Sequence, residues 1–375
     1  MTLQQNLKRT TIFTASALAL AVASASHAVD FEVGDTTASV YGYAKLDFIY
    51  DVDADLGEFV SHGNIRLDGD DGSDGHTTMN ARQSRIGFST ATPLEGSTLT
   101  TKIEGDFYGS GNKTFRLRHA YGSWNGILAG QTWTNFYGFV AGTPVIDFNS
   151  TFGTGNQSRQ AQLRYTVNNF SISLEEPEAL GKRVTFDGDA VSKSALPDLI
   201  ARYTDTSGPF KYSASAMGRQ LEVETDTFDD STLGWGIALE GAMDLSEALT
   251  LRAGVTHGDG IGGYLNVSPI QPPAYIDGDG DIDTLEGTGG TVGASLKAGP
   301  GAINAAYSIA TVDLDDETYG DDDTNETFES VHLNYIWSPA QRISYGIETS
   351  WHSREVADGR DGDAVRVQGM VMYSF

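Results

Sequence analysis

Two arginines, Arg116 and Arg118, stand two residues apart in the segment FRLRHAYGSW, and the upstream segment TLTTKIEGDFYG places Lys102, Glu104 and Asp106 at the same spacing. Residues two apart on a β-strand project to one face, so each segment offers a charged face opposite an apolar one. Arginine keeps its charge at ordinary pH, and its planar donors suit carboxylates, so such a face would attract anions. The alternative is that these charges pair with one another and hold neighbouring strands in register.

The same alternation recurs along the chain. The final segment AVRVQGMVMYSF sets Phe375, Tyr373 and Val371 against a face that carries Arg366 and Gln368. An aromatic last residue indicates that the chain end is anchored in structure, because the termini of most soluble domains fray and are polar. In FRLRHAYGSW, alternation assigns one face to Leu117, His119 and Tyr121 and the other to Arg116, Arg118 and Ala120.

Composition and the first residues narrow the class of protein. The net charge of −27 argues against a nucleic-acid partner, and the absence of cysteine excludes disulfides. Residues 1–28 combine Lys8 and Arg9, a short apolar run and small residues at 26–28, which is the order of a secretory signal peptide. We therefore expect cleavage after Ala28 and a single mature domain, residues 29–375.

The connections between the expected strands alternate between tight turns such as WNG and long acidic segments such as LDDETYGDDDTNE. Short turns at one rim and long loops at the other are typical of an outer-membrane meander. The sequence predicts an all-β fold, a transmembrane antiparallel β-barrel of about 16 strands with short periplasmic turns and long extracellular loops. A soluble sandwich is disfavoured because it would bury Lys102, Glu104, Arg116 and Arg118 on its inner face.

If the apolar face meets lipid, the charged face lines a water-filled interior. Alternation assigns to this lining Arg85, Lys102, Glu104, Asp106, Arg116, Arg118, Arg164, Arg202 and Arg252. The connection 135–160 is rich in Phe, Gly and Thr and poor in acidic residues, so we expect it to fold inward and narrow the passage. Its candidate lining groups are Tyr137 and Asp147.

One acidic loop resembles a calcium site. YIDGDGDIDTLE spaces Asp277, Asp279, Asp281 and Asp283 alternately, yet Ile282 stands where an EF-hand needs glycine. A solvated acidic loop is the favoured interpretation, so no metal or other cofactor is expected and calcium is the single candidate. The histidines have no paired metal-binding spacing, and no nucleophile elbow is present.

The segments ARQSRIGFSTATPL, KIEGDFYG and LRHAYGSWNGILAGQTWTNF, within 81–136, resemble the DcaP-like family of Gram-negative outer-membrane porins and, more loosely, the general trimeric porins. The resemblance implies a trimer of sixteen-stranded barrels, an inward third loop and uptake of small anionic solutes such as dicarboxylates. It also matches Arg85, Arg116 and Arg118 to the basic lining of the family. Phe375 and Tyr373 resemble the signal read by the barrel-assembly machinery.

The expected function is therefore passive diffusion of small hydrophilic solutes and ions through a porin of the cell outer membrane, in contact with lipid and lipopolysaccharide, and without enzyme activity. Two alternatives remain open. One is a barrel enzyme, a lipase or a protease, with a serine and a histidine drawn from SWHS at 350–353. The other is a non-conducting structural or adhesive barrel plugged by its own loops.

Overall fold

The computed structural model describes residues 28–110, 114–154, 157–177, 184, 191–224, 229–277, 280–314 and 323–375. Apart from Ala28, the expected signal peptide lies outside the described residues, so its cleavage stays a prediction. Within these described ranges, no helix has both the length and the apolar character needed to cross a membrane.

The described chain consists mainly of β-strands and their connections. In chain order the strands are β1 Val29–Val33, β2 Thr36–Asp51, β3 His76–Asn80, β4 Arg85–Leu94, β5 Ser97–Gly109, β6 Thr114–Trp124, β7 Ile127–Trp133, β8 Arg159–Val167, β9 Phe170–Glu175, β10 Val191–Lys193, β11 Asp198–Ser207, β12 Phe210–Glu224, β13 Asp229–Asp244, β14 Leu249–Asp259, β15 Ala274–Ile276, β16 Ile282–Thr284, β17 Glu286–Ala298, β18 Gly301–Val312, β19 Asn325–Ala340, β20 Ile343–Val356 and β21 Asp361–Ser374. The described connections also hold the short 3₁₀ helices η1 (His62–Asn64) and η3 (Gly262–Tyr264).

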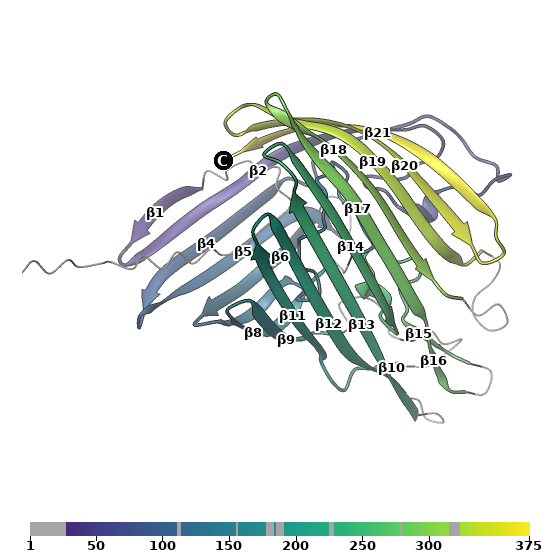
Figure 1. Cartoon of the computed structure of the whole chain (residues 1–375), viewed down its shortest axis with the longest axis horizontal. Coiled ribbons are helices and arrows are strands. Elements are labelled where there is room, and N and C mark those ends of the chain that lie inside the picture. Colours follow the sequence, from purple (N-terminus) through teal and green to yellow (C-terminus); the bar gives the residue numbers. More distant parts are fainter. Residues whose placement is uncertain are drawn as a thin grey trace, which may run out of the picture.

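Sixteen barrel strands close into one antiparallel barrel, which confirms the predicted fold (Figure 1). The last strand, β21, pairs with β2, where Val371 lies opposite Leu46. β3 and β4 both pair with β2 and together make one barrel strand, interrupted at 81–84. β1 pairs with the start of β2, β10 pairs with the end of β12, and β15 and β16 form a separate hairpin.

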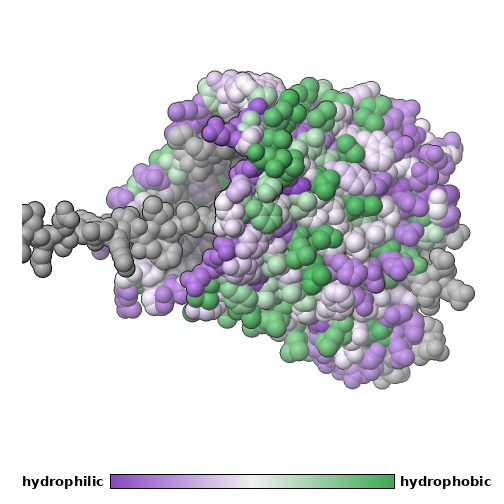
Figure 2. Space-filling model, viewed as in Figure 1, coloured by the Kyte–Doolittle hydropathy of each residue, from purple (hydrophilic) through white to green (hydrophobic). Residues whose placement is uncertain are grey.

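Strand alternation gives the barrel an apolar outer surface. In β13 the side chains of Leu233, Trp235, Ile237 and Leu239 are exposed, whereas Glu240 on the opposite face is buried. Such exposure is unfavourable in water but favourable in the hydrocarbon core of a bilayer. Figure 2 shows apolar residues spread over the outer surface of the strands, and hydrophilic residues that are more frequent toward the right-hand rim.

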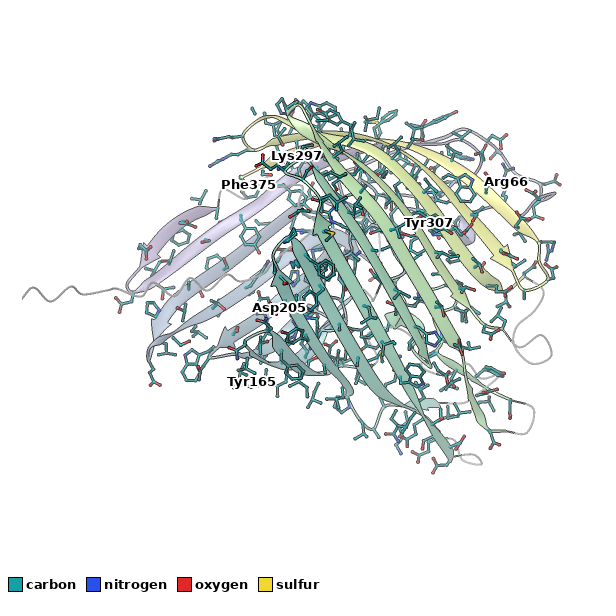
Figure 3. The ribbon with its side chains drawn as sticks, in the orientation of Figure 1. Arg66, Tyr165, Asp205, Lys297, Tyr307 and Phe375 are labelled. Atoms are coloured by element: carbon teal, nitrogen blue, oxygen red, sulfur yellow. The ribbon has the colours of Figure 1, made fainter. Side chains whose placement is uncertain are left out.

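Short turns form one rim and long connections form the other, as predicted. The β4–β5 turn has positive φ at Glu95 and Gly96, and the β6–β7 turn has positive φ at Asn125 and Gly126. Positive φ at both central residues is the geometry of tight type I′ hairpins, which match the twist of the flanking strands. In Figure 3, Phe375 lies at the short-turn rim, and Arg66, in the long connection after β2, lies at the opposite end.

The chain end is anchored, as its aromatic residue predicts. The backbone N–H of Phe375 donates to the Gly42 carbonyl at 3.0 Å, and the Gly42 N–H donates back to the Phe375 carbonyl at 3.2 Å. A Cβ added to Gly42 would lie 2.8 Å from the Phe375 ring and 2.2 Å from the Arg85 carbonyl oxygen. A side chain at position 42 would therefore clash with the Arg85 backbone and displace the Phe375 ring.

Two long connections carry an apolar core into the barrel. Phe136 and Phe152 come from the connection 134–158, termed L3, and Tyr264 comes from the connection 260–285, termed L6. Their buried partners on the wall lie on β11, β12, β13, β18 and β19. This core covers one side of the interior, and the charged inner faces of β4, β5, β6 and β8 belong to another side.

Candidate functional site

L3 folds into the barrel, as expected for 135–160, and Glu240 of β13 holds its first half. The Glu240 carboxylate accepts backbone hydrogen bonds from Gly138 at 2.6 Å, Val140 at 2.6 Å and Ala141 at 3.0 Å. All three bonds are assisted by the carboxylate charge, and they satisfy backbone donors that would otherwise be buried without partners. Glu240 therefore fixes the position of this half of L3 against the β13 wall.

A second group of charges holds the other half of L3. Glu348 of β20 accepts the backbone N–H groups of Ile146 at 2.9 Å and Asp147 at 3.2 Å. The Asp147 carboxylate accepts from Arg366 Nη1 at 2.9 Å, and Arg366 also contacts both oxygens of Asp51, at 2.6 and 2.8 Å. These groups are buried, and a buried ion pair requires such complete pairing to offset desolvation.

Arg116 and Arg118 form ion pairs with the acidic residues of the neighbouring strand. Arg118 reaches Glu104 Oε1 with Nε at 3.1 Å and Asp106 Oδ2 with Nη1 at 2.8 Å. Arg116 binds Asp106 through two parallel bonds of 3.0 and 2.8 Å. Both acidic residues are buried. The two arginines therefore pair within the wall, which was the alternative left open above.

Glu104 is the acidic centre of this cluster. In addition to its ion pair with Arg118, Glu104 forms an ion pair with Lys102 Nζ at 3.1 Å and accepts a hydrogen bond from the Tyr41 hydroxyl at 2.9 Å. Arg85 Nε lies 3.3 Å from the same carboxylate. Three predicted lining cations therefore meet at one buried glutamate, so positive charge exceeds negative charge at this point of the wall.

Part of the alternation assigned to FRLRHAYGSW is wrong. A β-bulge breaks the register between β5 and β6, because Glu104 lies opposite His119 and Gly105 lies opposite Leu117. Arg118 is the extra residue, so His119 projects inward beside it, where its ring nitrogens lie 3.0 Å from the Thr132 hydroxyl and 3.8 Å from Glu104. Beyond the bulge the alternation is inverted.

Tyr121 and Ala120 are therefore also reassigned. Tyr121 follows His119 onto the inner face, and its ring lies 6.4 Å from the His119 ring between centroids. Ala120 takes the outer face, which was the predicted place of Tyr121. The reason is the bulge itself, since one extra residue exchanges the two faces of all residues after it.

Three further arginines on this side have no carboxylate within ion-pair distance among the described residues. Arg202 donates to the Tyr137 carbonyl at 2.7 Å, and Arg164 donates to the Trp133 carbonyl at 2.6 Å. Arg159, which the sequence reasoning did not identify, stacks on the Trp133 ring at 4.3 Å. Trp133 also contacts the ring of Phe139 in L3 at 5.3 Å, so this pair lies on the inner side.

The charges on this side do not balance. Its seven cations are Arg85, Lys102, Arg116, Arg118, Arg159, Arg164 and Arg202, and their ion pairs within the described residues involve two carboxylates, Glu104 and Asp106. The buried carboxylates of Glu175 on β9 and Glu240 on β13 also act electrostatically on Arg202, and Glu175 acts on Arg164, so the seven cations face four carboxylates and three positive charges remain in excess. We term this set the cationic wall. Their strands, β4, β5, β6, β8 and β11, lie in one continuous stretch of the barrel.

Some predicted residues lie apart from the cationic wall. Arg252 is on β14, where it donates to Ser295 at 2.8 Å. Tyr137 is buried, and its ring packs 4.2 Å from that of Phe139. Burial, followed by the Glu240 carboxylate, raises the pKa of the Tyr137 phenol, which therefore stays neutral. Asp147 is buried in its pair with Arg366, so a direct lining role for either L3 residue stays a prediction.

Two of the three described carboxylates in the acidic hairpin of L6, those of Asp277 and Asp283, accept hydrogen bonds within the protein, and Asp281 is exposed. The Asp277 carboxylate accepts the Asp281 N–H at 2.9 Å, and Asp283 accepts the Tyr275 hydroxyl at 3.0 Å. Asp279 lies outside the described residues. Among the residues that are described, no group of three or more histidine, aspartate or glutamate side chains could hold a metal ion.

The comparisons with known proteins agree with this geometry. A model of the DcaP outer membrane protein family matches residues 2–375. The outer membrane channel DcaP of Acinetobacter baumannii is 27% identical with a TM-score of 0.81, covering 92% of this chain and 99% of that chain. No curated protein sequence matches the chain.

More distant structures share the fold alone. An anion-selective porin from Comamonas acidovorans is 12% identical with a TM-score of 0.61, covering 91% of this chain and 100% of that chain. The trimer form of OmpT, an outer membrane protein of Vibrio cholerae, is 14% identical with a TM-score of 0.54, covering 91% of this chain and 99% of that chain.

Proposed function

This chain belongs to the DcaP outer membrane protein family and forms a porin channel of the outer membrane, and from that premise we propose that the channel favours small anionic solutes, dicarboxylates among them. The observation that carries this proposal is the cationic wall, with seven cations and two ion-paired carboxylates. Uncompensated guanidinium groups in a confined passage raise the local concentration of anions.

Arg159, Arg164 and Arg202 are the groups best placed to meet a passing carboxylate. Arg164 and Arg202 donate to backbone carbonyl oxygens, and the Arg159 guanidinium stacks on the Trp133 ring. Each of the three guanidinium groups therefore retains N–H donors that can bind a solute. Arg116 and Arg118 are instead neutralised by Glu104 and Asp106, so the net positive charge beside Glu104 comes from Arg85 and Lys102.

The reversal potential in a tenfold KCl gradient across a planar bilayer tests this proposal. Ideal selectivity for one ion corresponds to about 59 mV per tenfold gradient, and we expect a potential on the chloride side of zero. Arg159→Gln should move the potential toward the potassium side, while the matched control Arg252→Gln, which lies on another strand, should move it less. A wild-type potential on the potassium side would overturn the proposal.

A dicarboxylate preference has its own readout. Succinate added to one side should shorten the open time of single channels in a concentration-dependent way, because two carboxylates can bind two guanidinium groups. Glycerol at the same concentration serves as the neutral control. Equal effects of succinate and glycerol would show that the channel has no preference for dicarboxylates. The reversal potential would still decide whether it prefers chloride.

We also propose that the chain is no enzyme and works as a homotrimer in contact with lipid and lipopolysaccharide after delivery by the barrel-assembly machinery. His352 Nε2 lies 2.9 Å from the Ser350 hydroxyl, the pair that an enzyme would need. Both side chains are buried, which denies a substrate access to the serine. Hydrolysis of an ester substrate that disappears in Ser350→Ala would contradict this proposal.

A further inference from the structure

Three buried histidines from three separate segments meet at one point of the interior. His62 comes from η1 in the connection 52–75, termed L1, while His332 comes from β19 and His352 from β20. The ring centroids of His62 and His352 lie 5.2 Å apart, as do those of His332 and His352. The three residues are 4%, 2% and 1% exposed, respectively. We term them the histidine trio.

The trio joins L1 and L3 to the barrel wall. The His62 ring stacks on Phe328 of β19 at 4.8 Å and meets the edge of Phe152 of L3 at 5.2 Å. Beside it, Arg354 of β20 donates to the carbonyl oxygens of Gly63 and Ile65, at 3.2 and 3.1 Å. His62 is thus the side chain through which η1 contacts both the wall and the inward loop.

The charges around the trio cannot neutralise three protons. Glu348 of β20, 3.4 Å from His332 Nδ1, is the one described carboxylate in ion-pair contact with the trio, and its oxygens already accept L3 backbone donors. Arg366 of β21 adds a positive charge near His352. The Glu329 carboxylate of β19 is bound by Tyr307 and Ser353, and this residue offers His62 its backbone carbonyl at 3.3 Å.

Other charged groups of the packed elements are engaged elsewhere. Asp147 of L3 and Asp51 of β2 both pair with Arg366. Arg354 of β20 is directed to L1 carbonyls and to the Asn325 side chain. Protons placed on the trio would therefore repel one another and Arg366, and ring packing would be retained best when the histidines are neutral.

We propose that the histidine trio is an acid-released latch, in which neutral rings hold L1 and L3 against the β19–β20 wall and protonation releases L1 to narrow the outer mouth. The latch is a regulatory function added to the channel. It rests on conduction by the porin and not on its preference for anions. A failed anion test therefore leaves this proposal standing, and a failed latch test leaves the anion preference standing.

The expected pH range follows from His62. Burial lowers the pKa of His62 from 6.5 to about 3. His62 binds a proton more readily when L1 is released than when its ring is packed. The packed state of L1 is therefore most stable above pH 6.5 and becomes progressively less stable as the pH falls toward 3. Between pH 7.5 and pH 4.5 the ratio of packed to released states should fall about 100-fold through His62 alone.

Single-channel recording at pH 7.5 and pH 4.5 tests the latch directly. We expect long closures at pH 4.5 in the wild-type channel and their loss in His62→Phe, because phenylalanine keeps the contacts with Phe328 and Phe152 and cannot be protonated. His257→Gln, a partly exposed histidine on β14, is the matched control and should close like the wild type. Equal acid closure in His62→Phe and the wild type would overturn the proposal.

Cysteine labelling gives a second readout that does not depend on the His62 variant. The chain has no cysteine, so Ile65→Cys, buried in L1, and Asp70→Cys, exposed in L1, each carry a single thiol. The labelling rate at 65 divided by that at 70 cancels the effect of pH on the reagent. We expect this ratio to rise at least tenfold between pH 7.5 and pH 4.5, and an unchanged ratio would overturn the proposal.

Discussion

Replacement of Glu240 by alanine tests whether one carboxylate positions L3. In the wild type this side chain accepts three backbone hydrogen bonds, from Gly138, Val140 and Ala141. Each buried N–H that loses its acceptor costs about 1–3 kcal/mol, so the three together cost about 3–9 kcal/mol. Water in the interior can replace part of the lost bonding, so we expect the lower end of that range.

A loss of about 3 kcal/mol weakens the attachment of this half of L3 to the β13 wall. The second half stays bound by Glu348 and by the Arg366–Asp147 pair, so the loop should pivot rather than leave. Released from the β13 wall, residues 138–141 move into the interior. The mean single-channel conductance should therefore fall, and its fluctuations should increase.

Recording in planar bilayers at neutral pH measures both quantities. Glu240→Gln is the informative companion, because its amide keeps one oxygen acceptor but loses the charge, and it should give an intermediate effect. Outer-membrane yield and heat-modifiability establish that the variants are folded. A folded Glu240→Ala channel with wild-type conductance and noise would show that L3 is held without this carboxylate.

Two further predictions concern the wall and the chain end. Replacing both Arg116 and Arg118 by glutamine should move the reversal potential toward cations and reduce assembly, because Glu104 and Asp106 lose buried partners. Adding Glu104→Gln and Asp106→Asn to this double variant should restore the yield of folded protein. A double variant that keeps full yield and anion preference would contradict the reasoning. Deleting Phe375 should lower the amount of barrel in the outer membrane while channels that do assemble conduct normally, and normal yield of the truncated chain would count against the predicted assembly role.

The outer architecture could be predicted from the sequence because lipid imposes a period of two on every strand. The alternation in AVRVQGMVMYSF is confirmed, with Tyr373 exposed and Arg366 buried. The last strand, β21, closes the barrel by pairing with β2. The inward course of 135–160 could be predicted because a loop with several phenylalanines needs an apolar contact, and Phe136 and Phe152 supply it.

Alternation fails where the backbone departs from regular pairing. The bulge at Arg118 could not be predicted from the sequence, because the residues of β6 fit an alternating pattern of polar and apolar side chains equally well without it. Arg159 has the same parity as Leu163 and Tyr165 on β8, so alternation alone would place it in lipid. It lies instead where β8 leaves L3, and its stacking on Trp133 reveals the inner position.

Long-range partners were equally inaccessible from the sequence. Glu240 and Glu348 are recognisable as polar residues on inner faces, yet the backbone N–H groups that donate to them lie about 100 and 200 residues away in L3. The histidine trio likewise joins His62 to residues almost 300 positions later. No local spacing encodes such contacts, because they depend on how far each loop turns into the barrel.

A net charge of −27 and a cationic wall are compatible because many of the acidic groups lie in exposed loops, away from the wall. Exposed loop carboxylates such as Asp74 and Asp323, which pair with Arg66 and Arg360, lie in solvent, where mobile ions screen a charge beyond about 8 Å at physiological ionic strength. The cationic wall is largely shielded from bulk solvent, so its field is screened less. A solute beside the cationic wall therefore responds to the charges of that wall more than to the exposed acidic groups of the loops.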